Sequence, residues 1–324
     1  MSDGTERSIL LLKPRGFCAG VVRAIDIVDL ALDAFGPPIY VRKEIVHNRH
    51  VVDDLAGRGA IFVDELEEVP VAGRVIYSAH GVAPAVRKDA ESRGLQVIDA
   101  TCPLVTKVHL EAIKFARGHN TILLIGHRDH DEVVGTLGEA PERTIVISSP
   151  EEAQTVDVPD ADSVAYLTQT TLSLDEADSI IGVLRKRFPK IQAPPAQDIC
   201  YATENRQQAV KRTTPNADLL LVVGSQNSSN SKRLVEVGEN GGIPGYLIDD
   251  ERDIEPTWLE GVRNVAITAG ASAPEVLVQR VIEHLRGFEF RNVREVEVIE
   301  ENVVFPLPPE LVADQQLTQI STIS

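Results

Sequence analysis

Short apolar runs alternate with segments of helical periodicity along nearly the whole chain. The runs begin at Ile9, Ile39, Arg74, Leu95, Thr121, Thr144, Ser163, Asp218, Gly245 and Asn264. Between them, stretches such as VVRAIDIVDLALDAF and LVTKVHLEAIKFARG carry apolar residues three and four positions apart, which is typical of amphipathic helices. Strands that alternate with helices predict an α/β fold with mainly parallel sheets.

A repeat appears in the loops that follow these runs. Each third of the chain places one cysteine before a helix-like segment, a polar loop residue 28 to 30 positions later, and another 33 to 42 positions after that. These residues are Cys18, His47 and His80, then Cys102, His130 and Thr170, then Cys200, Asn230 and Ser272. Such a period indicates a triplicated unit. Because ligands bind beyond the carboxyl ends of parallel strands, we expect three pseudo-repeated α/β units around a central cavity.

The repeat also suggests where the units begin and end. We place the first unit at residues 20–102, the second at 103–199 and the third at 200–288. The proline-rich stretch KRFPKIQAPPAQD is typical of a linker between the second and third units. The strand-like run at residues 9–13 fits any of the sheets, and the third is a plausible place for it. Residues 289–324 form a C-terminal extension, in which we expect a short edge strand and then a packed or frayed tail without a catalytic role.

Composition narrows the class of protein. The chain has 324 residues, of which 43% are hydrophobic, and a net charge of −17. No apolar run approaches the roughly 20 residues of a membrane span, and the N-terminal MSDGTERS lacks the features of a signal peptide. We therefore expect a cytoplasmic protein without membrane association. The acidity argues against nucleic-acid binding, which uses a basic face, but N–H groups and histidines can still bind a small anion.

Cys18, Cys102 and Cys200 are the only cysteines. A cytoplasmic chain seldom builds a disulfide framework, so the thiols are either three unrelated core residues or parts of one shared centre. Their matched contexts favour the shared centre, and a position near a helix N-terminus predicts a lowered thiol pKa. Three thiolates can hold a 4Fe-4S cluster and leave one iron open, whereas electron-transfer clusters usually have four cysteine ligands.

The loop GHRDHDEVVGT is the densest polar patch. It holds His127, His130 and Glu132 within six residues. The HxxH spacing resembles half of a metal site, and the alternative is a solvated histidine-rich loop. Glu132 is the carboxylate with the clearest opportunity for acid–base chemistry, since Asp129 and Asp131 flank His130 and are free to point outward.

Other polar loops offer groups for an anion. His47 stands at a strand-to-helix transition, and His80 precedes a proline suited to a helix start, where N–H groups favour negative charge. Thr170 stands in a similar loop, where capping a helix is the simpler role. A candidate oxyanion cradle is formed by Ser228, Ser229, Asn230 and Ser272. The chain has no GxxxxGKS/T motif, which disfavours nucleoside triphosphate binding.

Eight motifs follow one another in a fixed order along the chain. They are RGFCAGV, EIVHNRHVV, YSAHGV, DATCPLV, GHRDHDEVVGT, LTQTTLS, GSQNSSNS and TAGASAPE. Over residues 9–308 the chain is in this respect similar to the LytB/IspH family of hydroxymethylbutenyl diphosphate reductases. The resemblance implies three α/β units around a cavity and an iron-sulfur oxidoreductase. Such an enzyme removes the allylic hydroxyl of 4-hydroxy-3-methylbut-2-enyl diphosphate with two electrons and two protons. The products would be isopentenyl and dimethylallyl diphosphate, in the last step of the non-mevalonate isoprenoid pathway.

The resemblance further implies a role for each motif residue. Cys18, Cys102 and Cys200 would ligate a 4Fe-4S cluster. Glu132 would be the proton source, with Thr170 orienting the substrate hydroxyl and passing the proton. The residues that would bind the diphosphate are His47, His80, His130, Ser228, Asn230 and Ser272, with Ser229 close by. A ferredoxin or flavodoxin system would donate the electrons.

Two other functions fit parts of the pattern. A hydro-lyase with a three-cysteine cluster would remove water without net electrons, and dependence on an external reductant separates it from a reductase. A zinc- or iron-binding sensor would use the cysteines and histidines only as ligands, with no turnover and no role for Glu132.

Overall fold

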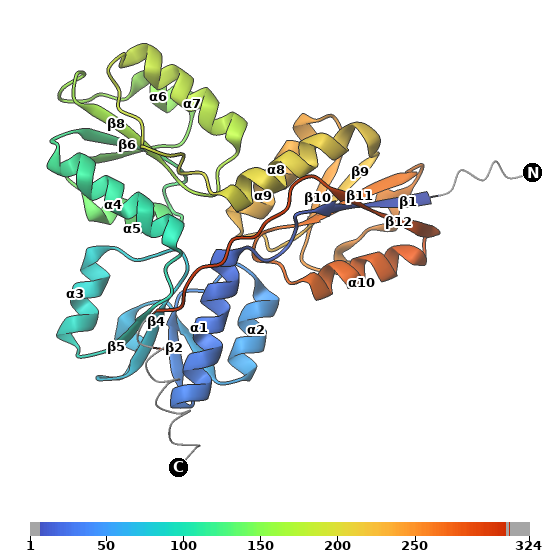
Figure 1. Cartoon of the computed structure of the whole chain (residues 1–324), viewed down its shortest axis with the longest axis horizontal. Coiled ribbons are helices and arrows are strands. Elements are labelled where there is room, and N and C mark those ends of the chain that lie inside the picture. The colour runs from blue at the N-terminus through green and yellow to red at the C-terminus, as the bar shows by residue number, and fades with distance from the viewer. Residues whose placement is uncertain (1–6, 309–310, 312–324) are drawn as a thin grey trace, which may run out of the picture.

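The computed structural model describes residues 7–308 and 311 of the chain. Within these residues it forms three separate sheets, and all of their strand pairs are parallel. Figure 1 shows the sheets and their helices as three lobes around a common centre. The predicted α/β fold with three units is confirmed. Among the described helices, none has both the length and the apolar composition that crossing a membrane requires.

The first sheet has the strand order β3-β2-β4-β5. Its strands and flanking helices are β2 (Ile39–Arg42), β3 (Ala60–Val63), β4 (Arg74–Tyr77), β5 (Gln96–Asp99), α1 (Ala19–Phe35), α2 (Arg49–Gly57) and α3 (Pro84–Ser92). Ile27 and Val28 of α1 pack against Ile39 and Ile76 of the sheet in one core. The sequence analysis missed β3, which only two residues separate from the end of α2.

The second sheet has the order β7-β6-β8. Its elements are β6 (Thr121–Ile125), β7 (Thr144–Ile147), β8 (Val164–Thr168), α4 (Pro103–Arg117), α5 (Asp131–Glu139), α6 (Pro150–Thr155) and α7 (Leu174–Arg187). All residues of β6 and β8 are buried, as expected for parallel strands with both faces covered. The proline-rich stretch after α7 packs along β8, since Gln192 bridges Ala165 and the Asp198 carboxylate accepts the Thr168 N–H.

The third sheet has the order β10-β9-β11-β1-β12. Its elements are β1 (Arg7–Lys13), β9 (Leu219–Val223), β10 (Gly245–Ile248), β11 (Asn264–Ala269), β12 (Phe290–Glu297), α8 (Tyr201–Thr213), α9 (Ser229–Asn240) and α10 (Glu275–Arg286). The N-terminal strand β1 therefore lies in this sheet, between β11 and β12, and β12 forms one edge. The unit boundaries at 20–102, 103–199 and 200–288 stay a prediction.

The three sheets share one strand order. In each, the first strand of the unit lies between the second and the third: β3-β2-β4, β7-β6-β8 and β10-β9-β11. The loops after the first and third strands consequently leave the sheet at neighbouring positions along its carboxyl edge. This arrangement explains why polar residues recur at similar offsets in the sequence.

Candidate active site

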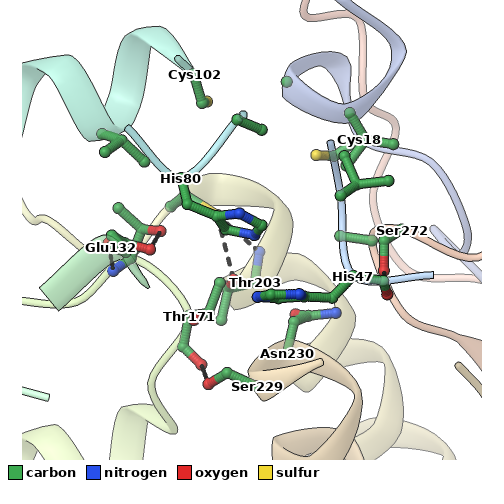
Figure 2. A pocket seen from close by; sticks show the side chains of 18 of the residues that line it. Cys18, His47, His80, Cys102, Glu132, Thr171, Thr203, Ser229, Asn230 and Ser272 are labelled. Atoms are coloured by element: carbon green, nitrogen blue, oxygen red, sulfur yellow. Dashed lines mark hydrogen bonds between the residues drawn. The ribbon is translucent and has the colours of Figure 1, made fainter. Parts of the chain in front are cut away.

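All the site residues predicted from the sequence line one cavity, which receives loops from all three units (Figure 2). They are Cys18, His47, His80, Cys102, His130, Glu132, Thr170, Cys200, Ser228, Ser229, Asn230 and Ser272. Each unit contributes one cysteine at the start of a helix, together with the polar residues that follow its first and third strands. The structure thus brings the residues of the sequence repeat together, while their individual roles stay proposals.

Three thiols stand at helix N-termini on the wall of this cavity. Cys18, Cys102 and Cys200 are the N-cap residues of α1, α4 and α8. Gly20 lies close to two of them: a Cβ built on it would be 2.7 Å from the Cys102 Sγ and 3.8 Å from the Cys18 Sγ. The Cys200 Sγ accepts the backbone N–H of Thr203 at 3.4 Å and lies 3.2 Å from its hydroxyl. Three sulfurs therefore share the cavity, and two of them flank a residue without a side chain.

The acidity of two thiols differs from the prediction. Burial, followed by the charge of Cys18, raises the pKa of Cys102 to about 12 and the pKa of Cys200 to about 11. The N–H groups of Leu104 and Val105, at the start of α4, do lower the Cys102 pKa, but the desolvation of a buried thiolate outweighs them. The predicted lowering is wrong for these two residues, because the sequence did not show how deeply they are buried.

His47, His80 and His130 form a compact group. The rings of His47 and His80 stack at a centroid distance of 4.0 Å, and His130 meets them edge-on at 5.4 and 5.6 Å. Burial, and then the neighbouring rings, lowers the pKa of His130 to about 3 and the pKa of His80 well below its usual value. The His130 Nδ1 accepts the Glu132 N–H at 3.2 Å, so its neutral ring carries the proton on Nε2. This group can donate hydrogen bonds to an anion, whose charge in turn favours ring protonation.

Glu132 is a fully buried carboxyl group held by Thr170. The Thr170 backbone N–H donates to Oε1 at 2.6 Å, and the Thr170 hydroxyl donates to Oε2 at 2.9 Å. Both bonds favour the ionised form, yet burial outweighs them and raises the pKa of Glu132 to about 7. A carboxyl group that is half protonated near neutral pH is suited to general acid catalysis. Thr170 binds this carboxyl, and the predicted alternative of helix capping falls to Ser173 at the start of α7.

Asn230 has an unused side chain in the cavity wall. The residue is 4% exposed, and within the described chain neither its Nδ2 nor its Oδ1 has a hydrogen-bond partner. A buried amide without partners is costly. Since Asn230 lines the cavity, its amide indicates a ligand that both donates and accepts hydrogen bonds, or that accepts while a bound water donates.

The serines around Asn230 hold the loops of different units together. The Ser272 hydroxyl donates to the carbonyl oxygen of His47 at 2.8 Å, and the Ser229 hydroxyl donates to the carbonyl oxygen of Thr171 at 3.3 Å. Ser228 is the N-cap residue of α9. These contacts tie the third unit to the first and the second, and they place the start of α9 at the cavity.

The sequence analysis did not select two cavity residues beside the thiols, nor one carboxylate near the histidines. Thr203 contacts a thiol, and Gly20 flanks two of them. Asp131 is not among the residues that line this cavity, but it places a carboxylate oxygen within 4.8 Å of ligand atoms on His47 and His80. Helical spacing was the available signal for Thr203, since it lies one turn into the helix that a predicted ligand begins. For Asp131 the sequence carried no such signal.

His127 belongs to a different contact. Arg233 of α9 donates to its Nε2 at 2.6 Å and also forms an ion pair with Glu176 of α7 at 3.3 Å. His127 is not among the residues that line the cavity. The HxxH spacing left open whether His127 pairs with His130 at a metal or lies in a solvated loop. In the structure His127 instead joins the second unit to the third.

Comparisons with known proteins place this geometry in context. Residues 9–286 match the LytB protein family. The 4-hydroxy-3-methylbut-2-enyl diphosphate reductase of Leifsonia xyli is 55% identical over 95% of this chain and 92% of its own length. The reductase of the same name from Azoarcus is 54% identical over 94% of this chain and 97% of its own.

Two solved structures are similar to this chain. One is the E-1-hydroxy-2-methyl-but-2-enyl-4-diphosphate reductase from Plasmodium falciparum, with a TM-score of 0.94 and 38% identity over 97% of this chain and 99% of that one. The other is a 4-hydroxy-3-methyl-but-2-enyl diphosphate reductase described as the terminal enzyme of the non-mevalonate pathway. It has a TM-score of 0.61 and 30% identity over 87% of this chain and 99% of its own.

Proposed function

The chain belongs to the LytB protein family, and we propose that it reduces 4-hydroxy-3-methylbut-2-enyl diphosphate to isopentenyl and dimethylallyl diphosphate. The observation that carries this proposal is the meeting of three thiols, a group of histidines and a protonatable carboxyl in one cavity. The reaction consumes two electrons and two protons, breaks the allylic C–O bond and releases water.

We propose that Cys18, Cys102 and Cys200 hold a 4Fe-4S cluster. Thiolates are the ligands of such clusters, and the missing side chain of Gly20 leaves free the space between two of the sulfurs. Burial keeps Cys102 and Cys200 protonated at neutral pH when no metal is bound, so binding of the cluster would release their protons. When bound, the cluster would supply electrons and an iron with an open coordination position.

The diphosphate of the substrate would lie against the histidines and the start of α9. The neutral ring of His130 offers an Nε2–H donor, and Asn230 offers an unused amide. The free N–H groups at a helix N-terminus also favour negative charge. Holding the diphosphate in this way would fix the allylic end of the substrate beside the thiols, so that binding energy is used for orientation.

Glu132 and Thr170 would deliver the proton to the departing oxygen. When Glu132 is protonated, its Oε2–H can donate to the Thr170 hydroxyl, which lies 2.9 Å away. That hydroxyl can then pass its own proton to the substrate oxygen. Glu132 is completely buried, so bulk water would stay away from the reacting bond. Glu132 would take up a new proton between turnovers.

The rate of turnover should fall as the pH rises above about 7. The protonated form of Glu132 is the active one, and its pKa is about 7. Well above that pKa, its population falls about tenfold for each pH unit. A pH–rate profile between pH 6 and 9, recorded with saturating reductant, checks this expectation. A profile that stays flat across this range would contradict the assignment of Glu132 as the acid.

The electron donor and the location follow from the same proposal. The reaction requires an external source of two electrons, and a ferredoxin or flavodoxin system is the class that we propose. We propose the cytoplasm as the location, as the sequence predicts.

An anaerobic assay with the allylic diphosphate tests the proposal directly. We expect the purified protein to hold about four iron and four sulfide ions, as a single such cluster requires, and to form both five-carbon diphosphates only when reductant is present. Loss of water from the substrate without a reductant, giving a more unsaturated diphosphate, would instead indicate a hydro-lyase. A zinc-containing protein without turnover would indicate a sensor.

A further inference from the structure

The chain after β12 crosses from the third unit to the first. We call residues 298–308 the strap; in Figure 1 it is the red segment that passes over the centre of the molecule toward α1. At its start, Val298 packs against the core of the third unit, and near its end Leu307 packs against the core of the first. The sequence analysis expected no catalytic role for this region. Through two arginines, however, the strap is connected to the segments that carry the three cysteines.

The first of these arginines is Arg206 in α8. Its side chain is completely buried, and it is the largest fully buried side chain in the described part of the protein. Its Nη1 donates to the two carboxylate oxygens of Glu301 in the strap, at 3.1 and 3.3 Å, and Asn205 donates to the same carboxylate at 3.0 Å. Burying a guanidinium group away from water costs free energy unless the charge is paired. Glu301, 15% exposed at its side chain, is thus the counter-charge that allows Arg206 to remain there.

Arg206 also donates to main-chain carbonyls beside two of the cysteines. Nη2 donates to the carbonyl oxygen of Gly16 at 2.7 Å, and Nη1 donates to that of Ala202 at 2.8 Å. Gly16 lies two residues before Cys18, and Ala202 lies two residues after Cys200. The bond to Ala202 lies within α8, whereas the bond to Gly16 reaches the loop before Cys18. The planar fork of arginine has a rigid geometry, so this side chain fixes the start of α8 relative to the loop of Cys18.

The second arginine serves the remaining thiol. Arg23 of α1 donates from Nε to the carbonyl oxygen of Pro306 in the strap at 2.7 Å, and from Nη1 to the carbonyl oxygen of Thr101 at 3.1 Å. Thr101 directly precedes Cys102. Arg206 therefore connects the segments of Cys18 and Cys200 to the strap, and Arg23 connects the loop of Cys102.

We propose that the strap positions the three thiols, with Glu301, Arg206 and Arg23 as the positioning residues. Three ligands of one rigid cluster must stand at fixed separations. The loops of different units are joined by direct contacts, such as the bond from the Ala19 N–H to the Tyr201 hydroxyl at 3.2 Å. The strap adds a connection that reaches all three cysteine segments. Its consequence for iron binding rests on the proposed function, whereas its effect on the thiol loops does not.

The change Glu301→Gln tests this inference, with Arg206→Lys as a second variant. Glu300→Gln is the matched control, because it removes the same charge one residue earlier, at an exposed position. In the metal-free protein, alkylation rates of each cysteine are followed by mass spectrometry. In the iron-loaded protein, iron release to an excess of chelator and the electron paramagnetic resonance spectrum of the reduced state are recorded. All measurements are made well below the unfolding temperature.

We expect Glu301→Gln to raise both the alkylation rates and the rate of iron release by about tenfold, the scale set by losing a charge-assisted hydrogen bond. The spectrum should also change, which a mere loss of overall stability would not cause. Arg206→Lys should act in the same direction, since an ammonium group cannot reach all three partners. Rates and spectrum equal to those of the Glu300→Gln control would overturn the inference. If the unchanged protein binds no iron, the proposed cofactor fails, and the alkylation rates still decide the role of the strap.

Discussion

Replacing Glu132 with glutamine should lower turnover by about 10²- to 10⁴-fold, the range typical of a lost general acid, while iron content and substrate affinity stay nearly unchanged. Glutamine has the same size, and its carbonyl oxygen can still accept the Thr170 N–H that now lies 2.6 Å from the carboxylate. The amide has no acidic proton to give, however, so the departing oxygen would leave without protonation. Single-turnover kinetics with pre-reduced protein measure this step separately from electron delivery.

Glu111→Gln is the matched control for this variant. Glu111 is also buried in the second unit, and burial together with the charge of Asp198 raises its pKa. It is not among the residues that line the cavity. We expect its replacement to leave turnover within a few-fold of the unchanged protein. Unchanged turnover in Glu132→Gln would remove Glu132 from proton delivery, and an equal loss in both variants would point to a general effect on the second unit.

The sequence predicted the convergence of the site because its spacing reflects the strand order. In parallel sheets, loops after adjacent strands leave from the same edge. A polar residue after the first strand and another after the third must then lie near each other, as His47 and His80 do. The cysteines were recognisable for a similar reason, since the start of a helix next to such an edge faces the same space. Spacing alone could thus place the residues, although it did not assign their roles.

Other features depended on burial or on contacts between distant segments. Position at a helix start predicted a lowered thiol pKa for Cys102, but the pKa is raised to about 12 because desolvation dominates. His127 looked like a partner of His130, yet Arg233, more than a hundred residues away, holds it elsewhere. Arg206 and Glu301, which are also in contact, are separated by a similar number of residues along the chain. No periodicity within the chain reports on pairs of this kind.

Replacing Cys102 with serine should abolish iron-cluster binding and reduce turnover to the background of the assay. A serine hydroxyl does not ionise near neutral pH, and only two thiolates would remain for the cluster. The fold itself should not suffer, because Cys102 makes no side-chain hydrogen bond to the N-terminus of α4. Serine is among the preferred N-cap residues, worth roughly 0.5–2 kcal/mol over a residue that cannot cap. The metal-free variant should therefore unfold at the same temperature as the metal-free protein or at a higher one. Absorption spectra, iron analysis and thermal unfolding check the three parts of this prediction.

The change Gly20→Ala probes the same thiol without removing it. Alanine is favoured over glycine in a helix interior by about 1 kcal/mol, and Gly20 is the second residue of α1, so the backbone of α1 should tolerate the change. The new Cβ would, however, stand 2.7 Å from the Cys102 Sγ, closer than two such atoms can approach, and the thiol would have to rotate away. We expect a protein as stable as the original that loses its iron readily.

A Cys102→Ser variant that keeps both the cluster absorption and the activity would exclude Cys102 as a ligand. If Gly20→Ala kept the cluster absorption and the activity while Cys102→Ser lost them, Cys102 would remain a ligand. Its thiol would then have room to rotate away from the new Cβ.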